Sequence, residues 1–353
     1  MLRLPKFRYL QPKSLTEAVR MMSDEGPDAA FVAGGTDLYP NMKRRQQVPK
    51  VVIGLAHLKQ LRTTKGKPAE GMVLGAGLTL TEVAEDRRIQ RVYAAVSKAA
   101  ELISTPLLRN MGTIGGNLLL DTRCNYYDQN YEWRKGIHFC MKKDGETCWV
   151  APSSPRCWAV QSSDSAPVMV AIGAKVKLVS TSEERLLPAG DLYRDDGIQY
   201  LSKRPDELLT EIHLPPTNGW RATYWKLRRR GSFDFPVLGV ATCLRLAGDG
   251  TVEHAKIVLG GVGSHPIEVT LSEKVIIGKK LTEETIHGAA EAAYSPAKPL
   301  DNTDFAMYWR KHMARYYVAS TLRELGGLPQ GLPHPETEDS VPALRVFSSG
   351  PFS

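Results

Sequence analysis

The chain has 353 residues, of which 42% are hydrophobic and 24% are charged, and its formal net charge is +8. This composition indicates a folded multi-domain protein with more than one core. No stretch approaches the roughly 20 apolar residues of a membrane span, and the first residues lack a signal-peptide pattern. We therefore expect a cytoplasmic protein without membrane contact. The basic clusters at 43–45 and 228–230 lack interleaved aromatic residues, so no nucleic-acid partner is predicted.

Helix and strand patterns are mixed along the chain, which predicts an α+β fold without internal repeats. We expect a capped helix at 14–26, a buried strand entering a glycine turn at 28–35, a strand, turn and helix over 69–86 with the helix starting near Thr81, and an amphipathic helix at 90–103. Farther on, the patterns predict a strand pair at 168–180, a long antiparallel hairpin within 223–263 that turns at Asp249-Gly250, and helices at 282–294 and 304–325. Pro215-Pro216 marks a domain boundary, and the composition after Pro329 predicts a poorly packed tail.

Two glycine pairs each follow an apolar segment. The first loop contains Ala33, Gly34, Gly35, Thr36 and Asp37, and the second contains Thr113, Ile114, Gly115, Gly116 and Asn117. Paired glycines let backbone N–H groups point into one concavity and allow close approach of an anion, while Thr and Asn add hydrogen bonds. Either loop alone could be a plain tight turn. Together, without the G-x-G-x-x-G or G-x-x-x-x-G-K-[ST] motif, they predict a diphosphate held from two sides.

The order of these features resembles the FAD-binding (medium) subunit of the molybdenum hydroxylase, or xanthine dehydrogenase, family. The likeness covers nearly the whole chain, through FRYLQPKSLTEAV, AGGTDL, TIGGNL, SDSAPVMVAIGAKVKLVS, DELLTEIHLP, YWKLRRRGSFDFPVLGVA and YWRKHMA. It implies a two-part FAD-binding domain with subdomains at 1–58 and 59–216, a C-terminal antiparallel-sheet and helix domain at 217–328, and a tail at 329–353. It also implies non-covalent FAD, whose pyrophosphate is cradled by the two glycine loops.

Three more polar residues match family positions. The resemblance implies that Asp164 lies near the ribityl or flavin end of the cofactor. It also implies that Lys226 and Asp234, in the third domain, lie near FAD. For these last two, ordinary polar positions on a strand and in a turn are the other interpretation.

Four of the five cysteines lie in one stretch, namely Cys124, Cys140, Cys148 and Cys157, with fifteen, seven and eight residues between successive members. Disulfides are disfavoured in a reducing cytoplasm. Structural zinc usually shows close Cys-x-x-Cys pairs, which are absent, although His138 could add a ligand. A [4Fe–4S] cluster needs four converging thiolates and tolerates wide spacing when a loop wraps it. The residue types thus predict a metal site, and Cys243, in an apolar strand, is predicted to be a core residue.

Ordinary family members pass almost directly from the TIGGNL match to the SDSAPVM match, whereas this chain inserts roughly 40 residues at about 121–161. The insertion resembles that of the β subunit of 4-hydroxybenzoyl-CoA reductase, where it carries a [4Fe–4S] cluster. DTRCNYYDQ and the pair Trp133-Arg134 share this likeness. The resemblance therefore implies that the four cysteines bind one such cluster.

This resemblance also implies an oxidoreductase subunit that relays electrons and has no catalytic residues of its own. Its partners would be a large molybdopterin-binding subunit and a small [2Fe–2S] subunit in a dimer of heterotrimers, with an external carrier such as ferredoxin. The reaction would be reductive dehydroxylation of 4-hydroxybenzoyl-CoA to benzoyl-CoA. Two alternatives stay open: the FAD subunit of a conventional molybdenum hydroxylase of an N-heterocycle or aldehyde with an auxiliary cluster, and a non-catalytic, zinc-stabilised flavoprotein scaffold.

Overall fold

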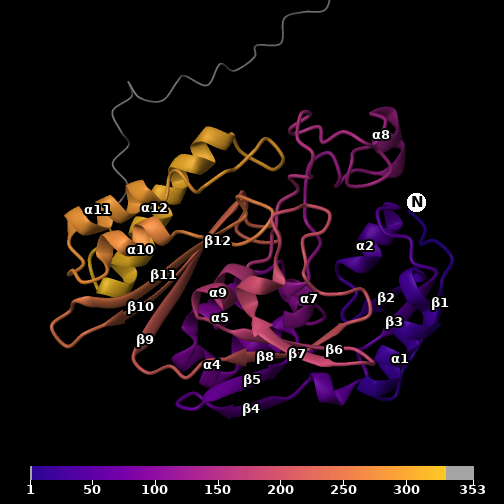
Figure 1. Ribbon diagram of the computed structural model, residues 1–353, viewed down its shortest axis with the longest axis horizontal. Coiled ribbons are helices and arrows are strands. Elements are labelled where there is room, and N and C mark those ends of the chain that lie inside the picture. The colour runs from indigo at the N-terminus through magenta and orange to yellow at the C-terminus, as the bar shows by residue number, and fades with distance from the viewer. Residues whose placement is uncertain (1, 331–353) are drawn as a thin grey trace, which may run out of the picture.

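The computed structural model describes residues 2–330 of the chain, and the tail predicted from Pro329 falls almost entirely outside this range. Three sheets and the helices packed on them make up the described part (Figure 1). The mixture of a parallel and two antiparallel sheets with helices confirms the predicted α+β class.

A three-stranded parallel sheet with strand order β1-β3-β2 forms the N-terminal part. Its elements are β1 (Arg8–Leu10), α1 (Leu15–Glu25), η1 (Gly26–Asp28), β2 (Ala29–Val32), α2 (Leu38–Lys43) and β3 (Val51–Gly54). Successive residues of β3 point to opposite faces, so Val51 packs with Met22 of α1, whereas Val52 packs with Met42 of α2. Gly26 ends α1 with a φ of 63°, as the sequence predicted.

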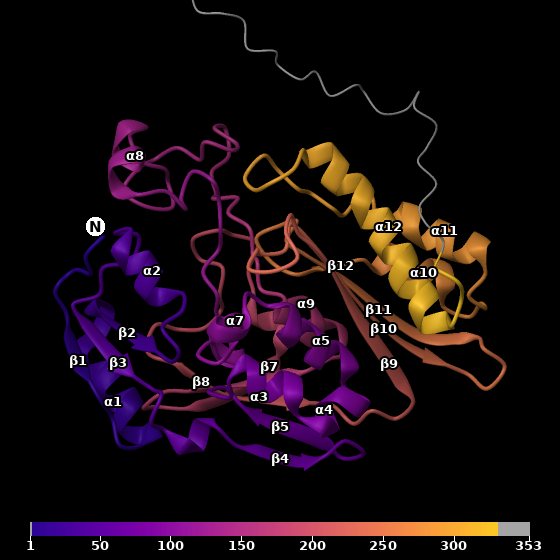
Figure 2. The same ribbon diagram turned by 180° about the vertical axis from the view of Figure 1, so that it is seen from behind.

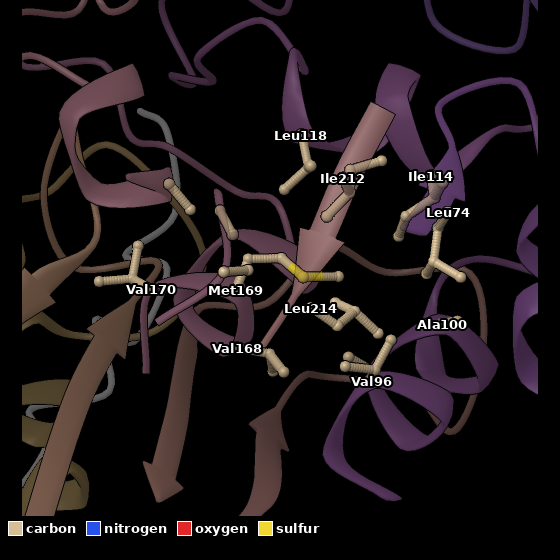
Figure 3. Close-up of a cluster of buried hydrophobic side chains, with 14 of the residues drawn as sticks. Leu74, Val96, Ala100, Ile114, Leu118, Val168, Met169, Val170, Ile212 and Leu214 are labelled. Atoms are coloured by element: carbon tan, nitrogen blue, oxygen red, sulfur yellow. The ribbon is translucent and has the colours of Figure 1, made fainter. Parts of the chain in front are cut away.

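A five-stranded antiparallel sheet with order β4-β5-β8-β6-β7 forms the second part. Its elements are η2 (Lys59–Leu61), β4 (Thr64–Lys67), β5 (Gly71–Gly75), α3 (Leu80–Glu85), α4 (Arg87–Val92), α5 (Ala94–Leu102), α6 (Pro106–Arg109), α7 (Ile114–Leu118), α9 (Ser165–Ala171), β6 (Lys175–Val179), β7 (Glu184–Pro188), η3 (Ala189–Leu192) and β8 (Leu208–Leu214). The largest hydrophobic core lies between this sheet and its helices, and Figure 3 shows part of it. The helix expected at 90–103 is interrupted at the buried Tyr93, which separates α4 from α5.

The strand pair expected at 168–180 is wrong in its first half. Residues 165–171 form the helix α9, in which every residue is buried, and only β6 is a strand. A helix that is apolar on all sides shows no amphipathic period, so a short apolar run does not distinguish it from a buried strand. Burial on every side of α9 therefore explains the error.

The third part is a four-stranded antiparallel sheet with order β12-β11-β10-β9. Its elements are β9 (Trp220–Leu227), β10 (Leu238–Leu246), β11 (Val252–Gly260), β12 (Ile267–Glu268), α10 (Thr270–Ile276), α11 (Glu283–Ala292) and α12 (Met307–Gly326). The hairpin predicted at Asp249-Gly250 is confirmed by the pairing of β10 with β11, and Gly250 has a φ of 85°. Helices α10 to α12 cover one face, while α5 and α9 meet the other and join this sheet to the second part (Figures 1 and 2).

The cysteine-bearing insertion projects from the body of the molecule on the side where α2 lies (Figures 1 and 2). It contains one short helix, α8 (Tyr131–Gly136), and otherwise consists of turns and bridges. Its two ends pair with each other, because Arg123 and Val160 form an antiparallel bridge at 2.7 and 2.8 Å. The insertion is thus a closed loop whose stem stands beside the second glycine loop.

Candidate functional site

A cleft of about 480 Å³ is lined by residues of both the N-terminal and the five-stranded sheet parts. The first glycine loop, from Ala33 to Asp37, lines it in full, and so do Thr113, Gly115, Gly116 and Asn117 of the second. Ile114 instead lies in the hydrophobic core. The fold therefore brings the two loops together around one space of the size that small-molecule sites have.

Glycine is needed where the backbones of this region touch. A Cβ atom at Gly34 would lie 1.8 Å from the carbonyl oxygen of Met111, and one at Gly115 would lie 2.7 Å from that of Ala76. Gly35 has a φ of 71°, a conformation that residues with a side chain rarely adopt. These glycines let the first loop pack directly against the segment that leads into the second.

The second loop uses several of its backbone donors inside the fold. The N–H groups of Ile114 and Gly115 donate to carbonyl oxygens of the 76–78 segment, both at 2.9 Å. The N–H group of Gly116 donates to the Thr113 hydroxyl at 3.1 Å. These three N–H groups are therefore already used within the fold. The loop offers a ligand close approach to its glycines more than it offers free backbone donors.

Polar side chains fix the two loops in place. The Asn117 side-chain oxygen accepts hydrogen bonds from the hydroxyls of Ser163 at 2.8 Å and Ser165 at 2.5 Å. The Asp37 carboxylate forms an ion pair with Arg123, whose side chain is only 7% exposed. Arg123 directly precedes Cys124 in the sequence. The first glycine loop is thus tied by an ion pair to the start of the insertion.

Several polar and aromatic residues line the cleft although the sequence did not predict them to be cofactor-site residues. They are Gln47, Asp121, Tyr200, Lys203 and Phe235. Burial lowers the pKa of Lys203 to about 8, and its ammonium donates to the carbonyl oxygens of Arg204 and Glu207 at 2.6 and 2.7 Å. No local motif marks these positions, because they reach the cleft through folding of segments that lie far apart in the sequence.

Asp164 and Lys226 form a buried ion pair with 2.9 Å between Oδ2 and Nζ, and their side chains are 3% and 1% exposed. Tyr224 donates its hydroxyl to the other Asp164 oxygen at 2.8 Å, and Lys226 also donates to the Leu102 carbonyl at 3.0 Å. Burial raises the pKa of Asp164, and the Lys226 ammonium opposes that shift. The pair joins α9 to β9 and does not belong to the described lining of the cleft, so contact of either residue with FAD stays a prediction.

Asp234 lies in the loop between β9 and β10. Its carboxylate accepts hydrogen bonds from the Arg230 backbone N–H at 2.8 Å and from Arg230 Nε at 2.9 Å, and these bonds hold its pKa below the usual value. It shapes the turn that brings Phe235 to the cleft, while Asp234 itself is not among the described lining residues. Its role near FAD also stays a prediction.

Cys124, Cys140, Cys148 and Cys157 are all buried, and all four line one small cavity inside the insertion. The rest of the lining is mostly aromatic and aliphatic, with Tyr126, Tyr127, Met141, Lys142, Trp149, Val150 and Ala159. The Ala159 backbone N–H donates to the Cys157 sulfur at 3.4 Å. Cys243 lies far along the chain in the core of β10, as predicted.

Burial lowers the acidity of three of the cavity thiols. It raises the pKa of Cys124 to about 12 and that of Cys157 to about 11, and it also raises the pKa of Cys140. Such thiols stay protonated unless a cation replaces the proton, because a metal bound to sulfur favours the thiolate. Four cysteines on one cavity are thiol donors of the kind that could hold a metal group, and the raised pKa values mean that such a group would have to displace their protons.

Within residues 2–330, no three His, Cys, Asp or Glu side chains form a group that could hold a metal ion. One zinc ion draws its thiolates to about 2.3 Å, so its ligands must nearly touch one another. A cubane cluster spreads its four thiolates over the corners of a larger body. The four cysteines share one cavity, but the described residues show no preformed metal site there, so a metal group at this position stays a prediction.

One residue of the C-terminal part clamps both stems of the insertion. The Asn302 carbonyl oxygen accepts from the Asn125 N–H at 2.9 Å, and its side-chain amide donates to the Trp158 carbonyl at 2.7 Å. Asn125 and Trp158 directly follow Cys124 and Cys157 in the sequence. The clamp therefore sets the distance between the two stems that carry the outer cysteines.

Comparison with known proteins places this architecture in a family. Residues 5–217 match the model of the FAD binding domain in molybdopterin dehydrogenase, and residues 222–325 match that of the CO dehydrogenase flavoprotein C-terminal domain. The chain belongs to this family of FAD-binding medium subunits, and it is an oxidoreductase subunit with FAD as its cofactor.

Relatives match over most of their length. The aldehyde oxidoreductase FAD-binding subunit of Escherichia coli is 30% identical over 90% of this chain and 98% of its own. The carbon monoxide dehydrogenase medium chain of Hydrogenophaga pseudoflava is 27% identical over 90% of this chain and 96% of its own. A solved structure of carbon monoxide dehydrogenase from that organism superposes with a TM-score of 0.74 at 26% identity, and covers 91% of this chain and 97% of its own. The fold predicted from the resemblance is thereby confirmed.

None of the helices within residues 2–330 combines the length and the apolar character that crossing a bilayer demands.

Proposed function

We propose that this chain binds FAD in the cleft and one [4Fe–4S] cluster at Cys124, Cys140, Cys148 and Cys157, and relays electrons between them. The observation that carries this proposal is the convergence of the four buried cysteines on one cavity, in an insertion whose stem adjoins the cleft. Flavins exchange one or two electrons and cubane clusters exchange one, so a subunit with both can couple a one-electron carrier to a two-electron reaction.

For FAD, we propose contacts from Ala33 to Asp37 and from Thr113 to Asn117, with further contributions near the flavin from Asp164, Lys226 and Asp234. Support for the two loops comes from their shared cleft and from the absence of side chains at Gly34 and Gly115, where the backbones touch. Lys203 would add a positive charge to the same cleft, which favours a ligand that carries a pyrophosphate.

We propose further that the chain works in a complex similar to 4-hydroxybenzoyl-CoA reductase. Its partners would be a large molybdopterin-binding subunit and a small [2Fe–2S] subunit, in a dimer of heterotrimers, with a low-potential carrier such as ferredoxin in the cytoplasm. Removal of a phenolic hydroxyl from 4-hydroxybenzoyl-CoA consumes two electrons and two protons and yields benzoyl-CoA and water. The inserted loop supports this assignment, since it is the feature in which the chain resembles that enzyme.

A conventional molybdenum hydroxylase with an auxiliary cluster is the second candidate. It is favoured by the names of the relatives, which include an aldehyde oxidoreductase, a carbon monoxide dehydrogenase and a nicotinate dehydrogenase. Electrons would then run from molybdenum outward through this chain. A zinc-stabilised scaffold finds less support, because the chain has no close Cys-x-x-Cys pair of the kind that structural zinc sites usually show.

The test is to purify the complex without oxygen and to measure iron, sulfide, zinc and FAD per chain. Cys140→Ser should lose about four irons and keep FAD, whereas the matched control Cys243→Ser, which changes a core cysteine outside the cavity, should keep both. Zinc in place of iron, or no metal, would overturn the cluster assignment. Formation of benzoyl-CoA from 4-hydroxybenzoyl-CoA with a low-potential reductant separates the first candidate from the second, which predicts none.

A further inference from the structure

A buried ion pair stands in the wall between the cysteine cavity and the cleft. Lys142 lines the cavity, and its side chain is 6% exposed. Asp121, also 6% exposed, lines the cleft. Their charged groups meet at 2.8 Å, so one interaction spans from one site to the other.

The Lys142 ammonium has a complete set of partners. Besides Asp121, it donates to the Thr122 hydroxyl at 2.7 Å and to the Gly197 carbonyl at 2.6 Å. It also lies 4.9 Å from the ring centre of Tyr127 and 5.3 Å from that of Tyr200. Three donors directed at three oxygens hold the charge at a fixed place instead of letting it reach solvent.

The rings of Tyr127 and Tyr200 also lie one at each site. Tyr127 lines the cysteine cavity and donates its hydroxyl to Asp121 Oδ2 at 3.1 Å, whereas Tyr200 lines the cleft. Gln47, on the cleft side, donates to the same Asp121 oxygen at 3.2 Å. The wall is therefore one connected polar network that begins at the cavity and ends at the cleft.

We propose that Lys142 and Asp121 are positioning residues that set the reduction potentials of the two redox centres from this shared wall, an inference that rests on the proposed function. A buried cation favours the reduced, more negative state of a nearby centre, and a buried anion disfavours it. Since Lys142 lines the cavity and Asp121 the cleft, the cation acts more strongly on the cluster and the anion more strongly on the flavin. The pair therefore raises the potential of the cluster relative to that of the flavin.

The test is a redox titration of the whole complex, in which the cluster is followed by electron paramagnetic resonance and the flavin by visible absorption. For Lys142→Met we expect the ratio of reduced to oxidised cluster at the wild-type midpoint to fall at least about tenfold, which corresponds to about 59 mV for a one-electron couple. The flavin should move in the same direction by less. Asp121→Asn should shift both centres in the opposite direction, with the larger change at the flavin.

Two controls separate charge from structure. Lys142→Arg keeps the positive charge, so its cluster potential should lie close to that of the wild type. If Lys142 acted only through its shape and packing, the arginine would not restore the potential. Lys143→Met removes the same charge from the next residue, which is 35% exposed, and solvent should screen its effect to less than about twofold in the same ratio.

The outcomes distinguish two failures. A wild-type complex without a four-iron cluster would overturn the proposed function, and the inference with it. A normal cluster whose potential shifts no more in Lys142→Met than in Lys143→Met would overturn only the inference. If the Lys142→Met complex does not load iron, the Asp121→Asn complex provides the test. Unchanged reduction potentials of both the cluster and the flavin in Asp121→Asn would contradict the electrostatic role.

Discussion

Replacement of Gly34 by alanine is expected to weaken FAD binding while leaving the rest of the fold in place. The added Cβ would lie 1.8 Å from the Met111 carbonyl oxygen and 2.5 Å from the carbonyl carbon, whereas real Cβ contacts are not shorter than 3.0 Å. The backbones of the first glycine loop and of the segment before the second must therefore separate by more than about 1 Å. The φ of Gly34 is not in the left-handed region, so the change is a steric test without added backbone strain.

The size of the effect follows from the cost of overpacking. Forcing a methyl group into a packed interior costs about 1–3 kcal/mol. If this cost falls on the state that closes around the cofactor, FAD affinity should drop by about 5- to 150-fold at 1.4 kcal/mol per tenfold. Titration of FAD-depleted protein by flavin fluorescence measures the dissociation constant, and thermal unfolding measures whether the fold is retained.

Gly248→Ala is the matched control, because Gly248 has open space around its Cβ position and lies in the β10–β11 hairpin turn. It should bind FAD as the wild type does. A Gly34→Ala protein with unchanged FAD affinity would refute the reasoning that this close contact shapes the cofactor site. Equal loss of affinity in both variants would show that the effect is not local.

Three further outcomes test other parts of the structure. Lys226→Met should lower the free energy of unfolding by about 3–5 kcal/mol because it leaves the Asp164 carboxylate buried without its partner, and Lys226→Met with Asp164→Asn should recover most of this in denaturant unfolding. The pKa of Lys203 is lowered to about 8 in the folded protein, so above that pH the unfolded chain binds more protons than the folded one. The free energy of unfolding of the wild type should therefore rise relative to that of Lys203→Met from about pH 8 to pH 10.5. A difference that does not change with pH would contradict the burial of this ammonium. Asn302→Ala removes the donor to the Trp158 carbonyl, and an unsatisfied buried acceptor costs about 1–3 kcal/mol. The variant should therefore release iron to a chelator faster than the wild type does. Equal release rates would show that Asn302 does not hold the two stems together.

Much of the architecture could be predicted from local patterns. The period of α1 and its cap, the Asp-Gly turn between β10 and β11, and the long helix α12 are set by interactions among neighbouring residues, and these elements were expected. The fully buried α9 was mistaken for a strand, because its burial comes from contacts with distant elements and leaves no periodic signature.

The sequence by itself determined which residues are candidates for binding a cofactor or a metal. The two glycine loops and the four clustered cysteines are recognisable because glycine and cysteine are used for what other side chains cannot do, namely close backbone approach and thiolate donation. The resemblance to the family also marked the insertion between the second loop and Asp164.

Only the tertiary structure decided which groups meet. It brought both loops to one cleft and all four cysteines to one cavity, and it placed Asp164 with Lys226 in an ion pair between α9 and β9. It also built the wall of Lys142 and Asp121, which are 21 positions apart in the sequence. The physical reason is that a contact between distant segments depends on how whole elements pack, and no local pattern of residues encodes that packing.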